Sequence, residues 1–330
     1  MKPEHGTTHY CQKLIIAALL LPLVVLAACQ STVIEGEAVN RLNDNWGEVV
    51  EEKAAFYFAS DVSEQHVELT KEWYEIAAKE WGNYGPLEFW IIGESEEAAA
   101  DLDKEYCDLR TSLSPSVELR HCLKRGHDFV TYAKEGQAGL NLRRNDYEEW
   151  SGFIVTMASK NPGPNEDDYK SVLLHEYFHV YQQAHVHTTD ESKRTELGQE
   201  NPWWQEGGAE YMGQLLYSQQ PGVRKEHLRN VMRWKLESVK DLRKGEHIDD
   251  IPYGPRAKIA YDLGTWFVAF LVNKTSIEAF RDDFFNDLNT HGFEGSFVKN
   301  FGSSSQSMLE EFHDQFLALS LDEKMSILPE

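Results

Sequence analysis

Residues 172–179 read Val-Leu-Leu-His-Glu-Tyr-Phe-His, and this stretch decides how the rest of the chain is interpreted. His175 and His179 are four residues apart, and residues at this spacing lie one above the other on one face of an α-helix. Both imidazoles can therefore reach one ion, and neutral imidazole is a common zinc ligand. Glu176 lies where a carboxylate can take a proton from an attacking water. Because the flanking residues are apolar, the stretch predicts a buried zinc-binding helix that carries its own general base.

A helix of this kind supplies two zinc ligands, and a catalytic site needs a third protein ligand while its fourth position stays open. Glu206 opens a second predicted helix and shares one face of it with Glu210. Glu206 can then bind the ion while Glu210 accepts a hydrogen bond from one of the ligand histidines. His185 is the alternative third ligand, but on a continuous helix it lies about 9 Å beyond His179 and off its face. The pattern favours Glu206.

The two motifs together resemble the gluzincin clan of zinc metallopeptidases, of the thermolysin and aminopeptidase N type. His-Glu-Tyr-Phe-His at 175–179 is similar to the H-E-x-x-H of that clan. Trp-Trp-Gln-Glu-Gly-Gly-Ala at 203–209 is similar to the W-x-x-E-G-x-A that carries the clan's glutamate ligand. The resemblance covers about residues 151–285. It implies a zinc cofactor, a peptide or protein substrate, and a hydrolytic site made of the residues named above.

The resemblance also implies a tyrosine that stabilises the oxyanion. Tyr261 begins Tyr-Asp-Leu-Gly, which is similar to the Y-x-x-G of aminopeptidase N-type enzymes, where the hydroxyl donates to the developing negative charge. Tyr253 is the alternative for this role, and an ordinary core position is the other interpretation of Tyr261. The G-x-M-E-N motif, with which those aminopeptidases hold a free amino terminus, is absent from the sequence, so endopeptidase activity is favoured.

The strand and helix patterns predict an α+β fold. Residues 41–160 are interpreted as a mixed α/β region, in which helical spacing alternates with apolar runs that fit strands at 54–59, 87–92 and 152–158. Residues 161–330 carry the motif helix and are otherwise predicted to be helical. A mixed α/β subdomain followed by a mainly helical one is the zincin-like arrangement that the resemblance implies. As the resemblance implies, an edge strand beside the zinc helix would bind the substrate backbone, and Phe153–Met157 is the predicted strand. Gly207 and Gly208 predict a close approach of the second motif helix to the first.

The beginning of the chain is interpreted as an export signal, residues 1–28, because lysines precede an apolar run that is too short to span a membrane stably. Leu-Ala-Ala-Cys at 26–29 resembles the lipobox of bacterial lipoproteins, which implies lipid attachment at Cys29, and residues 29–40 would then be a tether. The residue after that cysteine is Gln30 and not aspartate, which resembles the pattern of lipoproteins delivered to the outer membrane. The expected location is the bacterial cell envelope, with the protein held to a membrane by its lipid. An ordinary secretory peptide is the other interpretation.

The amino-acid composition argues against several classes of function. The 32 lysine and arginine residues against 55 aspartate and glutamate residues give a formal net charge of −23, which argues against nucleic acid as a partner. Cys11 would leave with the signal and Cys29 would carry lipid, so Cys107 and Cys122 remain and predict a disulfide in an exported protein. Neither lies in a C-x-x-C motif, which argues against redox catalysis and against a cysteine metal site.

The sequence therefore favours a lipid-anchored zinc endopeptidase. The competing class is a non-catalytic envelope lipoprotein that uses a metallopeptidase-like fold for binding or chaperoning. A purely structural zinc site is disfavoured, because Glu176 would then have no role beside the first ligand.

Overall fold

The computed structural model describes residues 46–114, 116–144, 151–160, 169–199 and 201–329. These residues belong to one unit of the chain, residues 31–330. The predicted export signal at 1–28, the lipidation site Cys29 and the tether at 29–40 lie outside the described residues. In the part of the chain that is described, no helix is long and apolar enough to cross a membrane.

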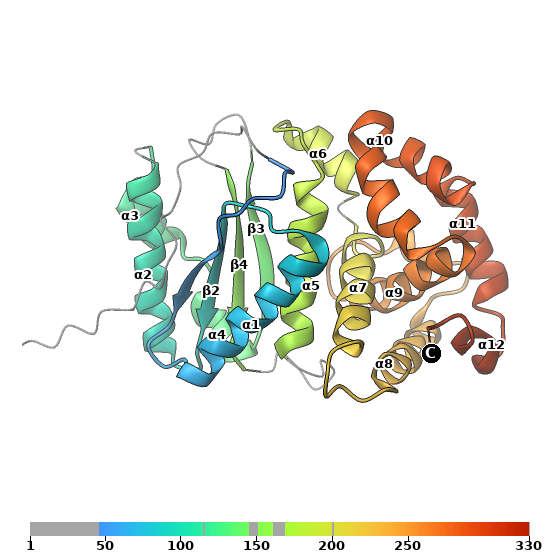
Figure 1. The fold of residues 1–330 in the computed structure, drawn as a ribbon, viewed down its shortest axis with the longest axis horizontal. Coiled ribbons are helices and arrows are strands. Elements are labelled where there is room, and N and C mark those ends of the chain that lie inside the picture. Colours follow the sequence, from blue (N-terminus) through green and yellow to red (C-terminus); the bar gives the residue numbers. More distant parts are fainter. Residues whose placement is uncertain (1–45, 115, 145–150, 161–168, 200, 330) are drawn as a thin grey trace, which may run out of the picture. The chain divides into compact units, whose positions relative to one another are not determined.

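A four-stranded sheet occupies the first half of the described chain (Figure 1). Its strands, in spatial order, are β1 (Ala55–Phe58), β2 (Leu87–Ile92), β4 (Gly152–Ala158) and β3 (Ala138–Arg143). The first three run parallel, and β3 pairs antiparallel with β4. The fold therefore combines helices with a small mixed sheet, which confirms the predicted α+β class.

The position of the edge strand corrects a prediction. Phe153–Met157 lies in β4, which pairs with β2 on one side and with β3 on the other. Every residue of β4 is buried, as is usual for an apolar strand covered on both faces. The edge beside the motif helix is β3 instead, and most of its residues are half-buried. Its mixed composition, with Gly139 after Ala138 and Asn141 between two leucines, gives no clear strand pattern in the sequence.

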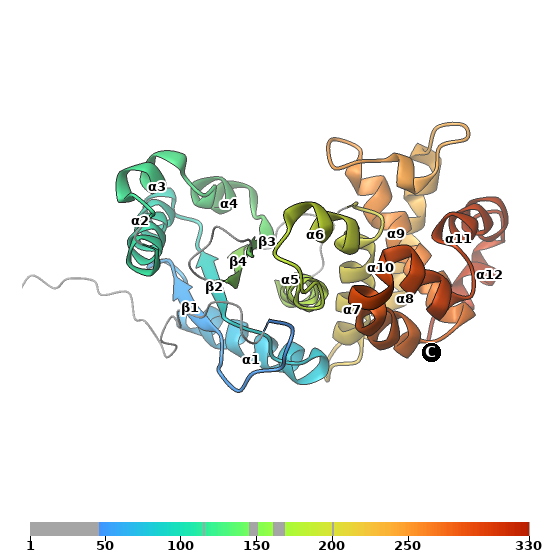
Figure 2. The same ribbon diagram turned by 90° about the horizontal axis from the view of Figure 1, so that it is seen from above.

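Helices cover both faces of the sheet (Figure 2). One face is covered by α1 (Glu64–Trp81) and α5 (Tyr169–Ala184), and the other by α2 (Glu96–Leu113), α3 (Leu119–Arg125) and α4 (Phe129–Glu135). Successive side chains of a strand point to opposite faces. In β2, accordingly, Phe89 and Ile91 join the core under α1 and α5, whereas Trp90 and Ile92 join the core under α2 and α4.

The remainder of the described chain is helical. It comprises α6 (Glu191–Gly198), α7 (Gln205–Ser218), α8 (His227–Lys235), η1 (Leu236–Asp241), η2 (Ile248–Asp250), α9 (Ala257–Lys274), η3 (Ala279–Asp283), α10 (Phe284–Phe301), α11 (Ser305–Glu311), η4 (Phe312–Phe316) and α12 (Leu321–Met325). In this part α7 packs between α5 and α9 (Figure 1). Trp204 packs edge-on against Phe280, Phe284 and Phe293, so the aromatic residues of this region build its core.

Glycines allow α7 to lie close to both of its neighbours. A Cβ added at Gly207 would lie 2.4 Å from the backbone of Gly264 in α9. A Cβ at Gly213 would lie 3.0 Å from a backbone nitrogen of α5. The predicted approach of Gly207 and Gly208 to the motif helix is therefore right only in part. Gly208 faces α5, where its Cβ would lie 3.0 Å from Nε2 of Gln182, whereas Gly207 faces α9.

Candidate metal centre

Three side-chain donor atoms converge between α5 and α7. They are Nε2 of His175, Nε2 of His179 and Oε2 of Glu206, and each of the three pairs is 3.1 Å apart. The group has the composition and spacing of a metal-binding cluster. Tetrahedral zinc with bonds of about 2.0–2.1 Å keeps its ligand atoms about 3.3 Å apart, so this triangle fits zinc. The structure thus brings together the three residues that the motifs predict as ligands.

Hydrogen bonds on the far side of each imidazole fix which nitrogen faces the triangle. Nδ1 of His175 donates to Oε2 of Glu210 at 3.0 Å, because a carboxylate can only accept. Nδ1 of His179 donates to Oε1 of Gln182 at 2.7 Å. The amide of Gln182 is oriented in turn, because its Nε2 donates to the backbone oxygen of Gln205 at 3.1 Å. In neutral rings both Nε2 atoms therefore present lone pairs to the centre of the cluster.

Three lone-pair atoms at such short range need a cation between them. In the metal-free cluster a proton meets this need. Burial lowers the pKa of His175, but the hydrogen bonds that its ring donates to Glu206 and Glu210 outweigh burial and hold that pKa well above its usual value. Burial raises the pKa of Glu206, but the two histidines outweigh burial and hold that pKa well below its usual value. A metal ion would displace the protons, because histidine binds metals in its neutral form.

A buried charge network lies behind Glu210. Nζ of Lys235 lies 2.9 Å from Oε1 of Glu210 and 3.3 Å from Oδ1 of Asp262. Asp262 also accepts hydrogen bonds from Ser238 and from Lys258. Burial raises the pKa of Glu210, but Lys235 and His175 outweigh burial and lower that pKa below its usual value. Lys235 was not predicted from the sequence, where its signal is Asp262, an aspartate in the mostly apolar α9 that needs a buried partner.

A cavity of about 820 Å³ opens onto the donor atoms, and β3 and the helices around the cluster line it. Glu176 is buried and forms part of its wall. Both candidate tyrosines also line the cavity, and their ring centres are 6.3 Å apart. The hydroxyl of Tyr253 donates to Oε1 of Glu206 at 2.8 Å, whereas Tyr261 is a half-buried wall residue. Both tyrosines therefore have access to the space beside the cluster.

The alternative third ligand, His185, lies away from the cluster at the end of α5. Its Nδ1 donates to the backbone oxygen of Tyr181 at 2.8 Å, and its ring packs near Tyr84 and Phe285. Burial lowers the pKa of His185 and so favours its neutral form. It is absent from the described residues that line the cavity. The geometry thus favours Glu206 over His185.

The predicted disulfide joins Cys107 of α2 to Cys122 of α3, on the face of the sheet opposite to α5. The two Cα atoms are 5.6 Å apart, within the usual range for a disulfide. The bond ties α3 to the longer α2 and is separate from the cluster.

Neither the models of known protein families nor the curated proteins include a match to this chain. The resemblance to gluzincins therefore remains a prediction from the two sequence motifs.

Proposed function

We propose that the chain is a zinc-dependent peptidase with a zincin-like arrangement, and that it cleaves peptide or protein substrates internally. The observation that supports this most directly is the convergence of two imidazole nitrogens and one carboxylate oxygen, each pair 3.1 Å apart, at the wall of a large cavity. Structural zinc sites are usually closed by four protein ligands, whereas catalytic sites have three and an open position. A three-ligand cluster at a cavity favours the catalytic type.

In this proposal His175, His179 and Glu206 hold the zinc ion. Bound zinc would supply a Lewis acid that polarises a peptide carbonyl and makes water more acidic. The carboxylate of Glu176 takes the proton of the attacking water and delivers it to the nitrogen of the leaving amine. The hydrogen bond that Nδ1 of His175 donates to Glu210 keeps the ring turned so that its Nε2 faces the ion.

Two features of the cavity wall complete the proposed site. A tyrosine hydroxyl, from Tyr261 or from Tyr253, donates to the substrate oxygen as negative charge develops on it. The edge strand β3 takes the role that was predicted for Phe153–Met157, because β3 lines the cavity and an edge strand can pair with an extended peptide.

The proposed location follows from the amino-terminal motif alone. Export by residues 1–28 and lipid attachment at Cys29 would hold the peptidase to the bacterial cell envelope, with its cavity open to envelope peptides or proteins.

The test is the zinc content of the purified protein in a form that begins after Cys29. We expect about one zinc per chain in the wild type, loss of zinc in Glu206→Gln, and retention of zinc in His185→Ala. A peptide-library digest follows, in which Glu176→Gln should bind zinc but cleave at most weakly. If the wild type binds no zinc after reconstitution, the peptidase proposal fails and the non-catalytic binding protein takes its place. Cleavage of amino-terminal residues only would refute the endopeptidase assignment.

A further inference from the structure

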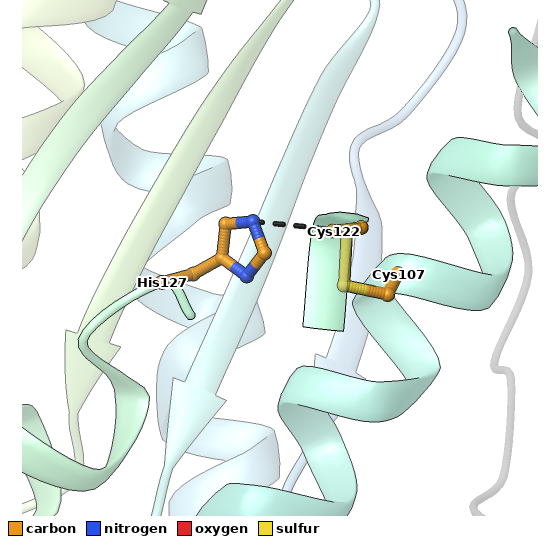
Figure 3. Close-up of side chains that lie close together, drawn as sticks. All are labelled: Cys107, Cys122 and His127. Atoms are coloured by element: carbon orange, nitrogen blue, oxygen red, sulfur yellow. Dashed lines mark hydrogen bonds between the residues drawn. A yellow bond between two sulfur atoms is a disulfide. The ribbon is translucent and has the colours of Figure 1, made fainter. Parts of the chain in front are cut away.

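A second cluster of reactive side chains lies on the other face of the sheet, around the disulfide. Figure 3 shows the ring of His127 turned toward Cys122. Nε2 of His127 lies 3.8 Å from Sγ of Cys122, and its Nδ1 lies 2.5 Å from Oδ1 of Asp103. The carboxylate, the imidazole and the sulfur therefore form one connected row.

This row has the chemistry of an activated cysteine. The carboxylate of Asp103 accepts the Nδ1 proton and so directs Nε2 of His127 at the sulfur. A nucleophile, an imidazole and a group that orients the imidazole are the usual parts of a cysteine activated by histidine. A protonated imidazole beside a cysteine favours its thiolate, which is the reactive form. Cys122 is thus equipped to act as a nucleophile once the disulfide is open.

Burial distinguishes the two sulfurs. Cys107 is 0% exposed, whereas Cys122 is 8% exposed on the short helix α3, with exposed residues on both sides of it in the chain. Cys122 is therefore the more accessible of the two cysteines to a thiol from solution. Cys107 is left as the buried partner that closes the disulfide again.

The surroundings of Cys122 indicate the charge of the molecule that would react there. α3 reads Leu-Arg-His-Cys-Leu-Lys-Arg, a basic segment in a chain whose formal net charge is −23. Arg120, Lys124 and Arg125 are exposed, and none of them forms an ion pair with another residue that the structure describes. These exposed cations attract anionic reactants to α3. Small thiols that carry carboxylates fit this setting best.

We propose that Cys107 and Cys122 form a thiol–disulfide exchange site, at which Cys122 makes a mixed disulfide with a small anionic thiol. In the first step the incoming thiolate attacks Sγ of Cys122, and a new S–S bond forms there. The bond to Cys107 breaks, its electron pair leaves on Sγ of Cys107, and this sulfur takes a proton from the imidazolium of His127. The reacting sulfurs and Nε2 of His127 lie within 4.8 Å of one another.

In the second step another small thiolate attacks the outer sulfur of the mixed disulfide. Cys122 leaves with the electron pair as a thiolate, and the reprotonated Nε2 of His127 donates a hydrogen bond to it. Overall, two small thiols are oxidised to one disulfide while the Cys107–Cys122 pair is reduced to two thiols. The same two steps in reverse oxidise Cys107 and Cys122 to the disulfide. The site needs no metal and is independent of the proposed peptidase activity.

The first experiment uses the unsubstituted full chain. Its thiols are reduced, oxidised glutathione is added as the anionic probe, and the reaction is stopped with acid at intervals. Mass spectrometry of proteolytic fragments then locates the mixed disulfide. We expect glutathione on the fragment that contains Cys122 before any appears on the fragment that contains Cys107. Attachment to Cys107 first, or to neither, would overturn the proposal.

The second experiment measures the rate at Cys122 in a Cys107→Ser background, where the mixed disulfide accumulates. Adding His127→Gln should slow the reaction with oxidised glutathione about tenfold, and adding Asp103→Asn should slow it less. His121→Gln is the matched control, because His121 is exposed on α3 next to Cys122 and should leave the rate unchanged. Cystamine, a cationic disulfide, should react more slowly than oxidised glutathione with the parent variant. Equal rates for the His127 and His121 variants would contradict the role of the imidazole.

Discussion

At the scale of single residues, Lys235 links Glu210, the hydrogen-bond partner of His175, to Asp262 of α9. Its ammonium group is buried between the carboxylates of Glu210 and Asp262. Burial lowers the pKa of Lys235, but the two carboxylates outweigh burial and raise it, so this side chain stays charged. Lys235→Met would leave both carboxylates buried without this cation. Because removal of one partner from a buried pair is costly, we expect the free energy of unfolding to fall by about 3–5 kcal/mol in urea titrations.

The matched control for that substitution is Lys258→Met. Lys258 also contacts Asp262, at 2.7 Å, but 59% of its side chain is exposed. Exposed ion pairs contribute little to stability, so the control should lose at most about 1 kcal/mol. Equal losses in the two variants would show that Lys235 is not the buried partner of this network.

The convergence of His175 and His179 could be predicted from the sequence because their relation is local, whereas Glu206 was predicted from its own motif. Helix geometry places His175 and His179 on one face, and the structure brings Glu206 to them. Gln182 and His127 could not be predicted, since each acquires its role from a contact that the tertiary structure creates. His127 lies 24 residues from Asp103 in the chain, and no spacing rule connects them. The absence of a C-x-x-C motif argues against a redox site, and the exchange site proposed at Cys107 and Cys122 depends on the tertiary contact with His127 instead.

At the scale of secondary structure elements, the contact between α5 and α7 controls the geometry of the cluster. Gly213 of α7 lies against the backbone of His175, where an added Cβ would be 3.0 Å from the backbone nitrogen. Gly213→Ala would normally stabilise a helix by about 1 kcal/mol. Here we expect no gain in stability, because the added methyl group displaces α5 at His175. Zinc affinity, measured by competition with a chelating dye, should fall about tenfold or more.

Gly198→Ala is the control for this contact. The atom closest to a Cβ at Gly198 is 3.5 Å away, an ordinary van der Waals distance. Zinc affinity should therefore remain at the wild-type value. If Gly213→Ala also binds zinc like the wild type, the close helix contact does not set the position of His175.

Buried strands could be predicted from the sequence better than the edge strand, because burial on both faces gives a strand an apolar pattern. β2 and β4 are mostly apolar and could be recognised, because both faces of each strand are covered. The same property made Phe153–Met157 a poor choice for the edge strand. The edge strand beside α5 is β3, which pairs with β4 alone among the strands that the structure describes. Its composition is mixed, so its pattern is weak in the sequence. Strand order depends on long-range pairing, which periodicity does not encode.

At the scale of the whole molecule, the cluster connects two regions of different construction. His175 and His179 come from α5, which packs against the sheet region, whereas Glu206 comes from α7, which packs against α9. An ion held by all three would therefore bind the two regions together. Such an ion favours the folded chain, because the three donors are brought together only by folding.

This arrangement predicts that zinc raises the thermal stability of the whole chain. A ligand present at 100 times its dissociation constant stabilises the folded state by about 2.7 kcal/mol, which corresponds to a rise in Tm of roughly 5 °C for a chain of this size. Calorimetry with zinc and then with excess EDTA should show the rise and its reversal. Glu206→Gln should show little rise, because the amide is a poorer zinc ligand than the carboxylate. A rise in Glu206→Gln equal to that of the wild type would mean that zinc stabilises the chain from another site, and the link between α5 and α7 through the ion would be refuted.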